Sequence, residues 1–173
     1  NSVPATYSVG FIKPGQVFTV EQLLNLTLIY SANDAAYALA EYIVNKNNSN
    51  HLLDSSNEAK TEFENSITKF SEMMNQKAKE LGTLDTNFVN PNGIHNEAHY
   101  STAYDLALIG KYAYSNSIIT SICAKASYSL PENAVNNFTE YKTTNPLLRS
   151  ESKYYYKYAT GMKTGYTDPA KSC

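Results

Sequence analysis

Apolar residues recur at helical spacing in several stretches of the chain. Those from Val20 to Ile29 cover most of a helical circumference, which predicts a largely buried helix. Thr19 and Gln22 stand three residues apart at its start, the spacing of a capping box. We therefore expect the helix to begin directly after Thr19 and to form part of the core.

A polar tetrapeptide interrupts this apolar pattern. It reads Ser31-Ala32-Asn33-Asp34, and a second helix with apolar stripes through Leu39 and Val44 starts there. The tetrapeptide is therefore expected at a bend between two apolar helices. Such a bend holds polar side chains at the edge of a core.

Two further helices are predicted after an Asn- and Ser-rich loop over residues 45–57. One runs over residues 58–81 and ends at Gly82, a residue suited to a helix C-terminus. The other is capped by Ser101-Thr102 and continues to about residue 114.

Extended structure is expected in three places. Residues 7–12 predict a short strand, residues 126–144 short strands or an extended hairpin, and residues 158–167 a final strand. Together with the helices, these segments indicate a mixed α+β fold. No repeat or linker divides the chain, so we expect residues 1–173 to form one partial domain that is truncated at both ends.

Composition excludes several function classes. Charged residues make up 17% of the chain and the net charge is −2, so no basic footprint for nucleic acid is present. No run of about 18 apolar residues occurs, which leaves no candidate membrane span. Cys123 and Cys173 lack partners at zinc-ligand spacing, so we expect neither a metal nor another cofactor, and a disulfide between them stays open.

Two short motifs carry candidate chemistry. Ser31 could pass a proton and Asn33 could bind a substrate amide, although such residues at a helix start are most often caps. Downstream, Lys163-Thr164-Gly165 places an ammonium and a hydroxyl on opposite faces of a strand beside a residue without a side chain. Taken alone, this tripeptide is more typical of a solvated strand lysine next to a turn.

Other candidate nucleophiles and bases are weaker. His51, His95 and His99 lie in predicted loops without a carboxylate placed for a triad. Two Ser-x-x-Lys tetrapeptides begin at Ser66 and Ser150, the first on what looks like a polar helix stripe and the second in a charged loop. We interpret both as chance matches.

The motifs occur within a wider pattern that resembles the D-alanyl-D-alanine carboxypeptidases, the low-molecular-mass penicillin-binding proteins. The matching segments follow in family order over nearly the whole chain: 13–15, 19–24, 31–36, 74–82, 88–94, 99–107 and 161–167. The resemblance implies a penicillin-binding-protein and β-lactamase-like transpeptidase fold, of which this chain covers mainly the helical subdomain and the Lys-Thr-Gly strand.

The resemblance also implies a function. The family consists of serine-type enzymes of the bacterial cell envelope, outside the cytoplasm, which remove the terminal D-alanine from peptidoglycan stem peptides and are acylated by β-lactam antibiotics. It implies that Ser31 relays a proton, Asn33 binds the acyl-side amide and Lys163 positions substrate and supports the relay. Thr164 would contact the substrate carboxylate and the backbone at Gly165 would line the groove.

One departure from the family pattern limits this expectation. The nucleophile belongs to a Ser-x-x-Lys segment N-terminal to Ser-x-Asn, and the residues before Ser31 contain none. We therefore expect the isolated chain to be inactive, and any membrane anchor to lie in segments absent here. Two alternatives stay open, a serine β-lactamase and a non-catalytic peptidoglycan-binding relative.

Overall fold

The structure, a computed structural model, describes residues 8–13, 15–46, 57–131 and 140–172. The chain divides into two compact units. The first comprises the residues up to Ala36 together with those from Tyr114 onward, and the second is Tyr37–Ala113. Ser31, Asn33 and the Lys-Thr-Gly segment all belong to the first unit.

Helix α1 (Val20–Ile29) is the centre of the first unit. The predicted capping box is confirmed, because the Thr19 hydroxyl accepts the backbone N–H of Gln22 and the Gln22 side chain accepts that of Thr19. The buried side chains of α1 are Leu23, Asn25, Leu26 and Ile29. The helix thus starts and packs as its sequence pattern predicts.

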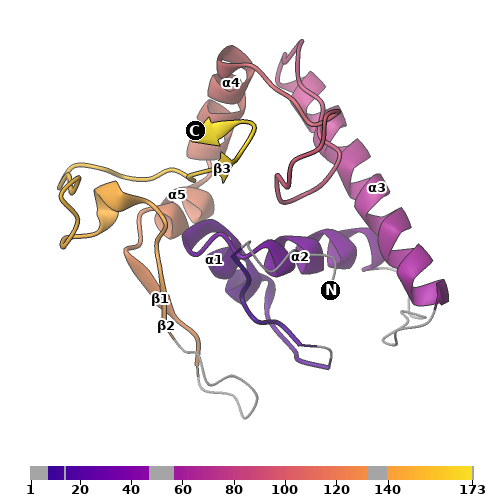
Figure 1. Ribbon diagram of the computed structural model, residues 1–173, viewed down its shortest axis with the longest axis horizontal. Coiled ribbons are helices and arrows are strands. Elements are labelled where there is room, and N and C mark those ends of the chain that lie inside the picture. The colour runs from indigo at the N-terminus through magenta and orange to yellow at the C-terminus, as the bar shows by residue number, and fades with distance from the viewer. Residues whose placement is uncertain (1–7, 14, 47–56, 132–139, 173) are drawn as a thin grey trace. The chain divides into compact units, whose positions relative to one another are not determined.

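Two elements from the second half of the chain pack on α1 (Figure 1). They are helix α5 (Ser117–Cys123) and the antiparallel hairpin of β1 (Ser127–Ser129) and β2 (Glu140–Lys142). Tyr141 in β2 is fully buried, and its ring packs edge-on against Tyr30 at the end of α1. The hairpin was predicted, whereas the short helix α5 was not.

The remaining elements of the first unit are short. A 3-10 turn, η1 (Pro146–Leu148), follows the hairpin, and β3 (Tyr166–Thr167) pairs antiparallel with β4 (Lys171–Ser172) at the end of the chain. β3 directly follows the Lys-Thr-Gly segment.

The second unit is mainly helical, and its long helix is α3 (Asn57–Glu80). Helix α2 (Asn33–Asn45) starts in the first unit and continues into the second, and α4 (Ala103–Tyr114) closes the second unit. Helix α3 ends in a Schellman motif, with the N–H of Gly82 bonded to the carbonyl of Lys79 and that of Thr83 to Ala78. The predicted stop at Gly82 is therefore confirmed.

One strand prediction is wrong, and another holds only at its C-terminal end. Tyr7 of the strand predicted over residues 7–12 lies outside the described residues, residues 8–12 are irregular, and Phe11 has a φ of +60°, which breaks an extended conformation. Residues 158–165 are also irregular, and only Tyr166–Thr167 is a strand. Both segments form hydrogen bonds to side chains and loops instead of to a neighbouring strand.

Neither a membrane span nor a disulfide is found in the described ranges. Among the helices there, none combines the length and apolar composition needed to cross a bilayer. Cys123 is a buried free thiol, and Cys173 lies outside the described residues, so the possible disulfide between them stays untested.

Candidate active site

Ser31 lies in the turn between α1 and α2 with a backbone conformation that few non-glycine residues adopt. Its φ is +64°, a region that costs an L-residue about 1–2 kcal/mol. The turn is held because the backbone N–H of Ala32 donates to the carbonyl of Leu26 at 3.1 Å. Within the described part of the chain the Ser31 hydroxyl has no hydrogen-bond partner. A strained residue with an uncommitted hydroxyl is typical of a functional position.

Asn33 and Asp34 fasten the N-terminal segment to the start of α2. The backbone N–H and the side-chain NH₂ of Asn33 both donate to the carbonyl of Ser8, at 3.0 and 2.9 Å. The carboxylate of Asp34 accepts the backbone N–H of Gly10 at 2.6 Å and of Ile12 at 3.0 Å. These bonds replace a strand ladder, and they leave the carboxamide oxygen of Asn33 to accept an N–H donor.

Gly10 packs against this corner. A Cβ at Gly10 would lie 3.4 Å from both the Ala32 Cβ and a carboxylate oxygen of Asp34. On the other side, the hydroxyl of Tyr141 donates to the Gly10 carbonyl at 3.0 Å. Burial, with a smaller contribution from the Asp34 charge, raises the pKa of Tyr141, so this hydroxyl stays protonated.

The Lys163-Thr164-Gly165 segment precedes β3 without regular secondary structure. The hydroxyl of Thr164 lies 2.6 Å from that of Thr144, and the Lys163 ammonium donates to the backbone carbonyl of Thr164. Lys163 and Gly165 are exposed, whereas Thr164 is half-buried. The side chains expected to meet a substrate are therefore accessible.

Cys123 supports the chain just before this segment. A Cβ at Gly161 would lie 3.1 Å from the Cys123 Cβ and 3.3 Å from its carbonyl oxygen, and the φ of +128° also favours glycine, so a side chain here would be strained. Burial raises the pKa of the Cys123 thiol, and the positive charge of Lys163 partly opposes the shift. The thiol is thus a packing group at neutral pH.

Thr144 connects the two motifs within the first unit. Its backbone N–H donates to the carbonyl of Ile29 at 3.1 Å, two residues before Ser31. Its hydroxyl forms the 2.6 Å hydrogen bond with Thr164. Thr144 therefore bonds both to the end of α1, just before the bend, and to the Lys-Thr-Gly segment, although the bend and this segment are far apart in the sequence. The two hydrogen bonds of Thr144 support the prediction that Ser31, Asn33 and Lys163 line one cleft. It stays a prediction.

Two surface hollows lie elsewhere. One of about 510 Å³ belongs to the second unit and is lined by residues that include Asn45 and Ser66. The other, of about 380 Å³, belongs to the first unit and is lined by residues that include Lys142 and Arg149. Neither is lined by a predicted site residue, so neither is the expected substrate groove.

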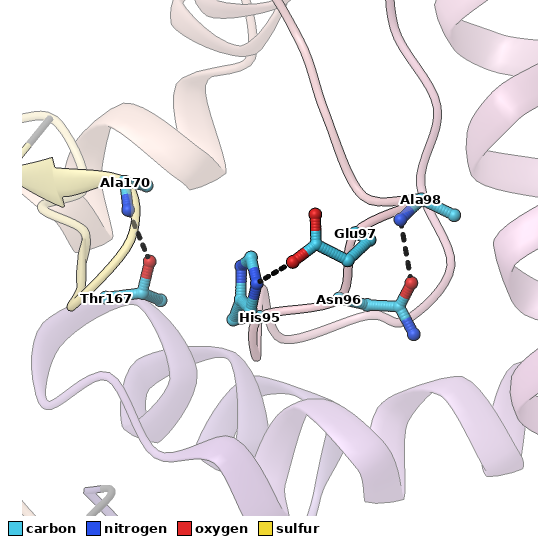
Figure 2. Close-up of polar contacts among 6 residues, drawn as sticks. All are labelled: His95, Asn96, Glu97, Ala98, Thr167 and Ala170. Atoms are coloured by element: carbon cyan, nitrogen blue, oxygen red, sulfur yellow. Dashed lines mark hydrogen bonds and ion pairs between the residues drawn. The ribbon is translucent and has the colours of Figure 1, made fainter.

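The histidines do not form a triad in the described ranges. His95 lies 3.4 Å from the carboxylate of Glu97, which is almost fully exposed (Figure 2). The Nδ1 of His99 accepts the backbone N–H of Val89, and burial lowers the pKa of this ring. His51 lies outside the described residues. These contacts are local, as the sequence indicates.

A separate contact in Figure 2 belongs to the first unit. The hydroxyl of Thr167 accepts the backbone N–H of Ala170 at 3.3 Å. This bond closes the turn between β3 and β4 and so fixes the strand that follows Gly165.

The two internal Ser-x-x-Lys tetrapeptides lack the features of a nucleophile. Ser66 is not on a polar stripe as expected but is only 2% exposed, and its hydroxyl donates to the Glu62 carbonyl while it accepts the Asn45 side chain. Ser150 lies in an exposed turn. No group of three or more His, Cys, Asp or Glu side chains in the described ranges could hold a metal ion.

Two residues that organise the site were not singled out from sequence. The sequence shows Asp34 only as a possible cap, and Thr144 belongs to no motif. Thr143 and Asn145, on either side of Thr144, are buried at 5% and 6% exposure. Such an alternation over three residues is too short to distinguish from chance.

Comparisons with known proteins agree with the pattern of motifs. Residues 48–173 match the family model of the D-alanyl-D-alanine carboxypeptidases. The chain is 36% identical over 163 residues to the D-alanyl-D-alanine carboxypeptidase DacF of Bacillus subtilis, a match that covers 94% of this chain and 35% of that protein. It is 32% identical to the D-alanyl-D-alanine carboxypeptidase of Streptomyces strain K15, over 92% of this chain and 50% of that one.

Solved structures give the same result. The crystal structure of the Streptomyces K15 DD-transpeptidase matches with a TM-score of 0.75 and 33% identity, over 96% of this chain and 58% of that chain. Penicillin-binding protein D2 of Listeria monocytogenes, solved in its cefotaxime-bound form, matches with a TM-score of 0.67 and 26% identity, over 97% and 57%. The predicted fold class is therefore confirmed.

The match is broad within this chain but partial within its relatives. The chain spans about a third to a half of the length of the curated relatives, and somewhat more than half of the solved chains. The family model nevertheless covers most of these 173 residues, including Lys163, Thr164 and Gly165. The chain belongs to the D-alanyl-D-alanine carboxypeptidase family.

Proposed function

We propose that this chain is the part of a serine-type D-Ala-D-Ala carboxypeptidase that supplies the proton relay and the substrate-binding side of the active site. One observation carries the proposal: the hydrogen-bonded path from Ile29 through Thr144 to Thr164, which joins the Ser-x-Asn bend to the Lys-Thr-Gly segment. Family membership supports the same reaction.

In this reaction a serine oxygen attacks the carbonyl of the penultimate D-alanine. An ester forms, the peptide bond breaks and the terminal D-alanine leaves with a proton on its amine. Water then hydrolyses the ester, which restores the serine and releases the shortened peptide. The nucleophile is proposed to lie on a Ser-x-x-Lys segment outside these 173 residues.

The residues of this chain have four proposed roles. Ser31 carries a proton between the nucleophile's lysine and the leaving amine, for which its uncommitted hydroxyl is suited. Asn33 binds the acyl-side amide through its carboxamide oxygen, because its NH₂ is bonded to Ser8. Lys163 attracts the substrate carboxylate electrostatically, and Thr164 donates a hydrogen bond to it.

Partners and location follow from the same proposal. The substrate is a peptidoglycan stem peptide that ends in D-Ala-D-Ala, so the protein acts outside the cytoplasm in the bacterial cell envelope. A β-lactam presents a reactive amide and a carboxylate in a similar arrangement, and the Listeria relative was solved with cefotaxime bound. β-Lactams are therefore proposed to acylate the same nucleophile.

The test is release of D-alanine from diacetyl-L-Lys-D-Ala-D-Ala by the longest form of the protein that its gene encodes. We expect release by the wild type and a loss of at least about 100-fold in kcat/KM for Lys163→Ala. The matched control is Lys153→Ala, an exposed lysine that contacts only the Tyr154 ring in the described structure, which should leave the rate unchanged. Absence of D-alanine release by a folded wild type would contradict the proposal.

A further inference from the structure

Thr144 lies between two buried residues that fix its position. The backbone N–H of Thr143 donates to the Ala126 carbonyl at 2.8 Å. Asn145 accepts the Leu147 N–H at 3.0 Å through its side-chain oxygen and donates to the Met162 carbonyl at 3.4 Å. Because these hydrogen bonds fix Thr143 and Asn145, the backbone of Thr144 between them is fixed as well, and its side chain is exposed at a defined position.

The hydroxyl groups of Thr144 and Thr164 are 2.6 Å apart, within the usual range for an O–H···O hydrogen bond. Each hydroxyl has one proton to donate. One proton is used between the two oxygens, and the other stays available to a ligand. The direction of this hydrogen bond therefore decides which of the two threonines has a free proton to donate to a ligand.

We propose that Thr144 is a positioning residue for substrate binding, and that it donates its proton to the Thr164 oxygen so that Thr164 donates to the substrate carboxylate. This inference rests on the proposed function. A carboxylate only accepts hydrogen bonds, so it selects the direction in which Thr164 has a proton to give. A hydroxyl that accepts one hydrogen bond also donates a stronger one.

The backbone of Thr144 extends this role to the other motif. Its N–H bond to Ile29 ties the same residue to the turn that carries Ser31. Thr144 therefore sets the spacing between the carboxylate-binding hydroxyl and the proposed proton relay. Because this second bond comes from the backbone, a side-chain substitution leaves it in place and tests the hydroxyl alone.

Thr144→Val keeps the side-chain shape and removes the donor. With one hydrogen bond to the carboxylate-binding group lost, we expect KM for diacetyl-L-Lys-D-Ala-D-Ala to rise about 5–10-fold while kcat changes less than about twofold. Thr144→Ser keeps the hydroxyl and should restore KM to within about twofold of the wild type. Circular dichroism and thermal unfolding of each variant establish that it is folded.

A double-variant comparison separates a positioning role from a general structural one. If Thr144 acts through Thr164, adding Thr144→Val to Thr164→Val should cause no further rise in KM. Additive effects, an unchanged KM in Thr144→Val, or a Thr144→Ser variant as impaired as Thr144→Val would each overturn the inference. An inactive folded wild type would instead overturn the proposed function, and the inference with it.

Discussion

At the scale of single residues, hydrogen bonds between segments that are distant in the sequence hold the candidate site together. The side chains of Asn33 and Asp34 bond the backbone of residues 8–12, and the backbone and hydroxyl of Thr144 together link Ile29 to Thr164. Such bonds fix loops that have no neighbouring strand. We therefore expect substitutions of side chains with no role in the chemistry to affect activity.

Asp34 offers the most direct test of this arrangement. Asp34→Ala removes three charge-assisted hydrogen bonds, two to the distant N–H groups of Gly10 and Ile12 and a local one to that of Ala35, and should lower the free energy of unfolding by about 1–3 kcal/mol. Hydrogen exchange at Gly10 and Ile12 should accelerate before exchange at the buried amides of α1. Urea unfolding and exchange followed by NMR measure both effects.

Asp168→Ala provides the matched control. Asp168 is exposed, and within the described ranges its carboxylate accepts only the Tyr166 hydroxyl, so its removal should change stability by less than about 0.5 kcal/mol. Equal effects of the two variants would mean that Asp34 does not hold the N-terminal segment.

At the scale of elements, helix ends and the β1–β2 hairpin were predictable, whereas the extended segments without a partner strand were not. Thr19, Gln22 and Gly82 act through bonds to residues within a few positions, so the sequence contains the whole signal. Residues 8–12 and 158–165 bond to Asp34 and to Thr144, which are far away in sequence. An extended pattern predicts a strand only if a partner strand is present.

In the candidate site, too, features with a local sequence signal were predictable and features that depend on distant contacts were not. The two motifs and the family resemblance indicated Ser31, Asn33, Lys163, Thr164 and Gly165 without any coordinates. Thr144 could not be found this way, because its proposed role depends on hydrogen bonds to two residues that are distant in the sequence, Ile29 and Thr164. The strain at Ser31 is likewise a property of the turn, which propensity does not reveal.

The glycine at the C-terminus of α3 gives a stability prediction that can be compared with a glycine inside α4. Gly82 has a φ of +88°, so Gly82→Ala should destabilise the protein by about 1–2 kcal/mol. Gly110 lies inside α4, and apart from its chain neighbours and the backbone of its own helix no described atom lies within 4 Å of the place that an alanine methyl group would take, so Gly110→Ala should stabilise the protein by about 0.5–1 kcal/mol. Thermal unfolding of the two variants should shift in opposite directions, and shifts of the same sign would contradict the account.

At the scale of the whole molecule, the chain carries the Ser-x-Asn and Lys-Thr-Gly motifs proposed for the relay and binding side of an acyl-transfer site, but its sequence has no Ser-x-x-Lys ahead of the Ser-x-Asn bend. Ser66 is buried and bonded, and both Ser66 and Ser150 follow rather than precede the bend. The curated relatives are about two to three times as long as this chain. The central claim is therefore that acylation needs a Ser-x-x-Lys segment outside residues 1–173.

Intact-mass spectrometry after incubation with excess benzylpenicillin tests this claim most directly, applied to the 173-residue chain and to the longest form that the gene encodes. The longer form should gain the mass of one penicillin, mapped by peptide analysis to a Ser-x-x-Lys serine N-terminal to these residues. The 173-residue chain should gain none, because loss of the nucleophile lowers the rate by several orders of magnitude. A stoichiometric adduct on any serine within residues 1–173, in either form, would contradict the account.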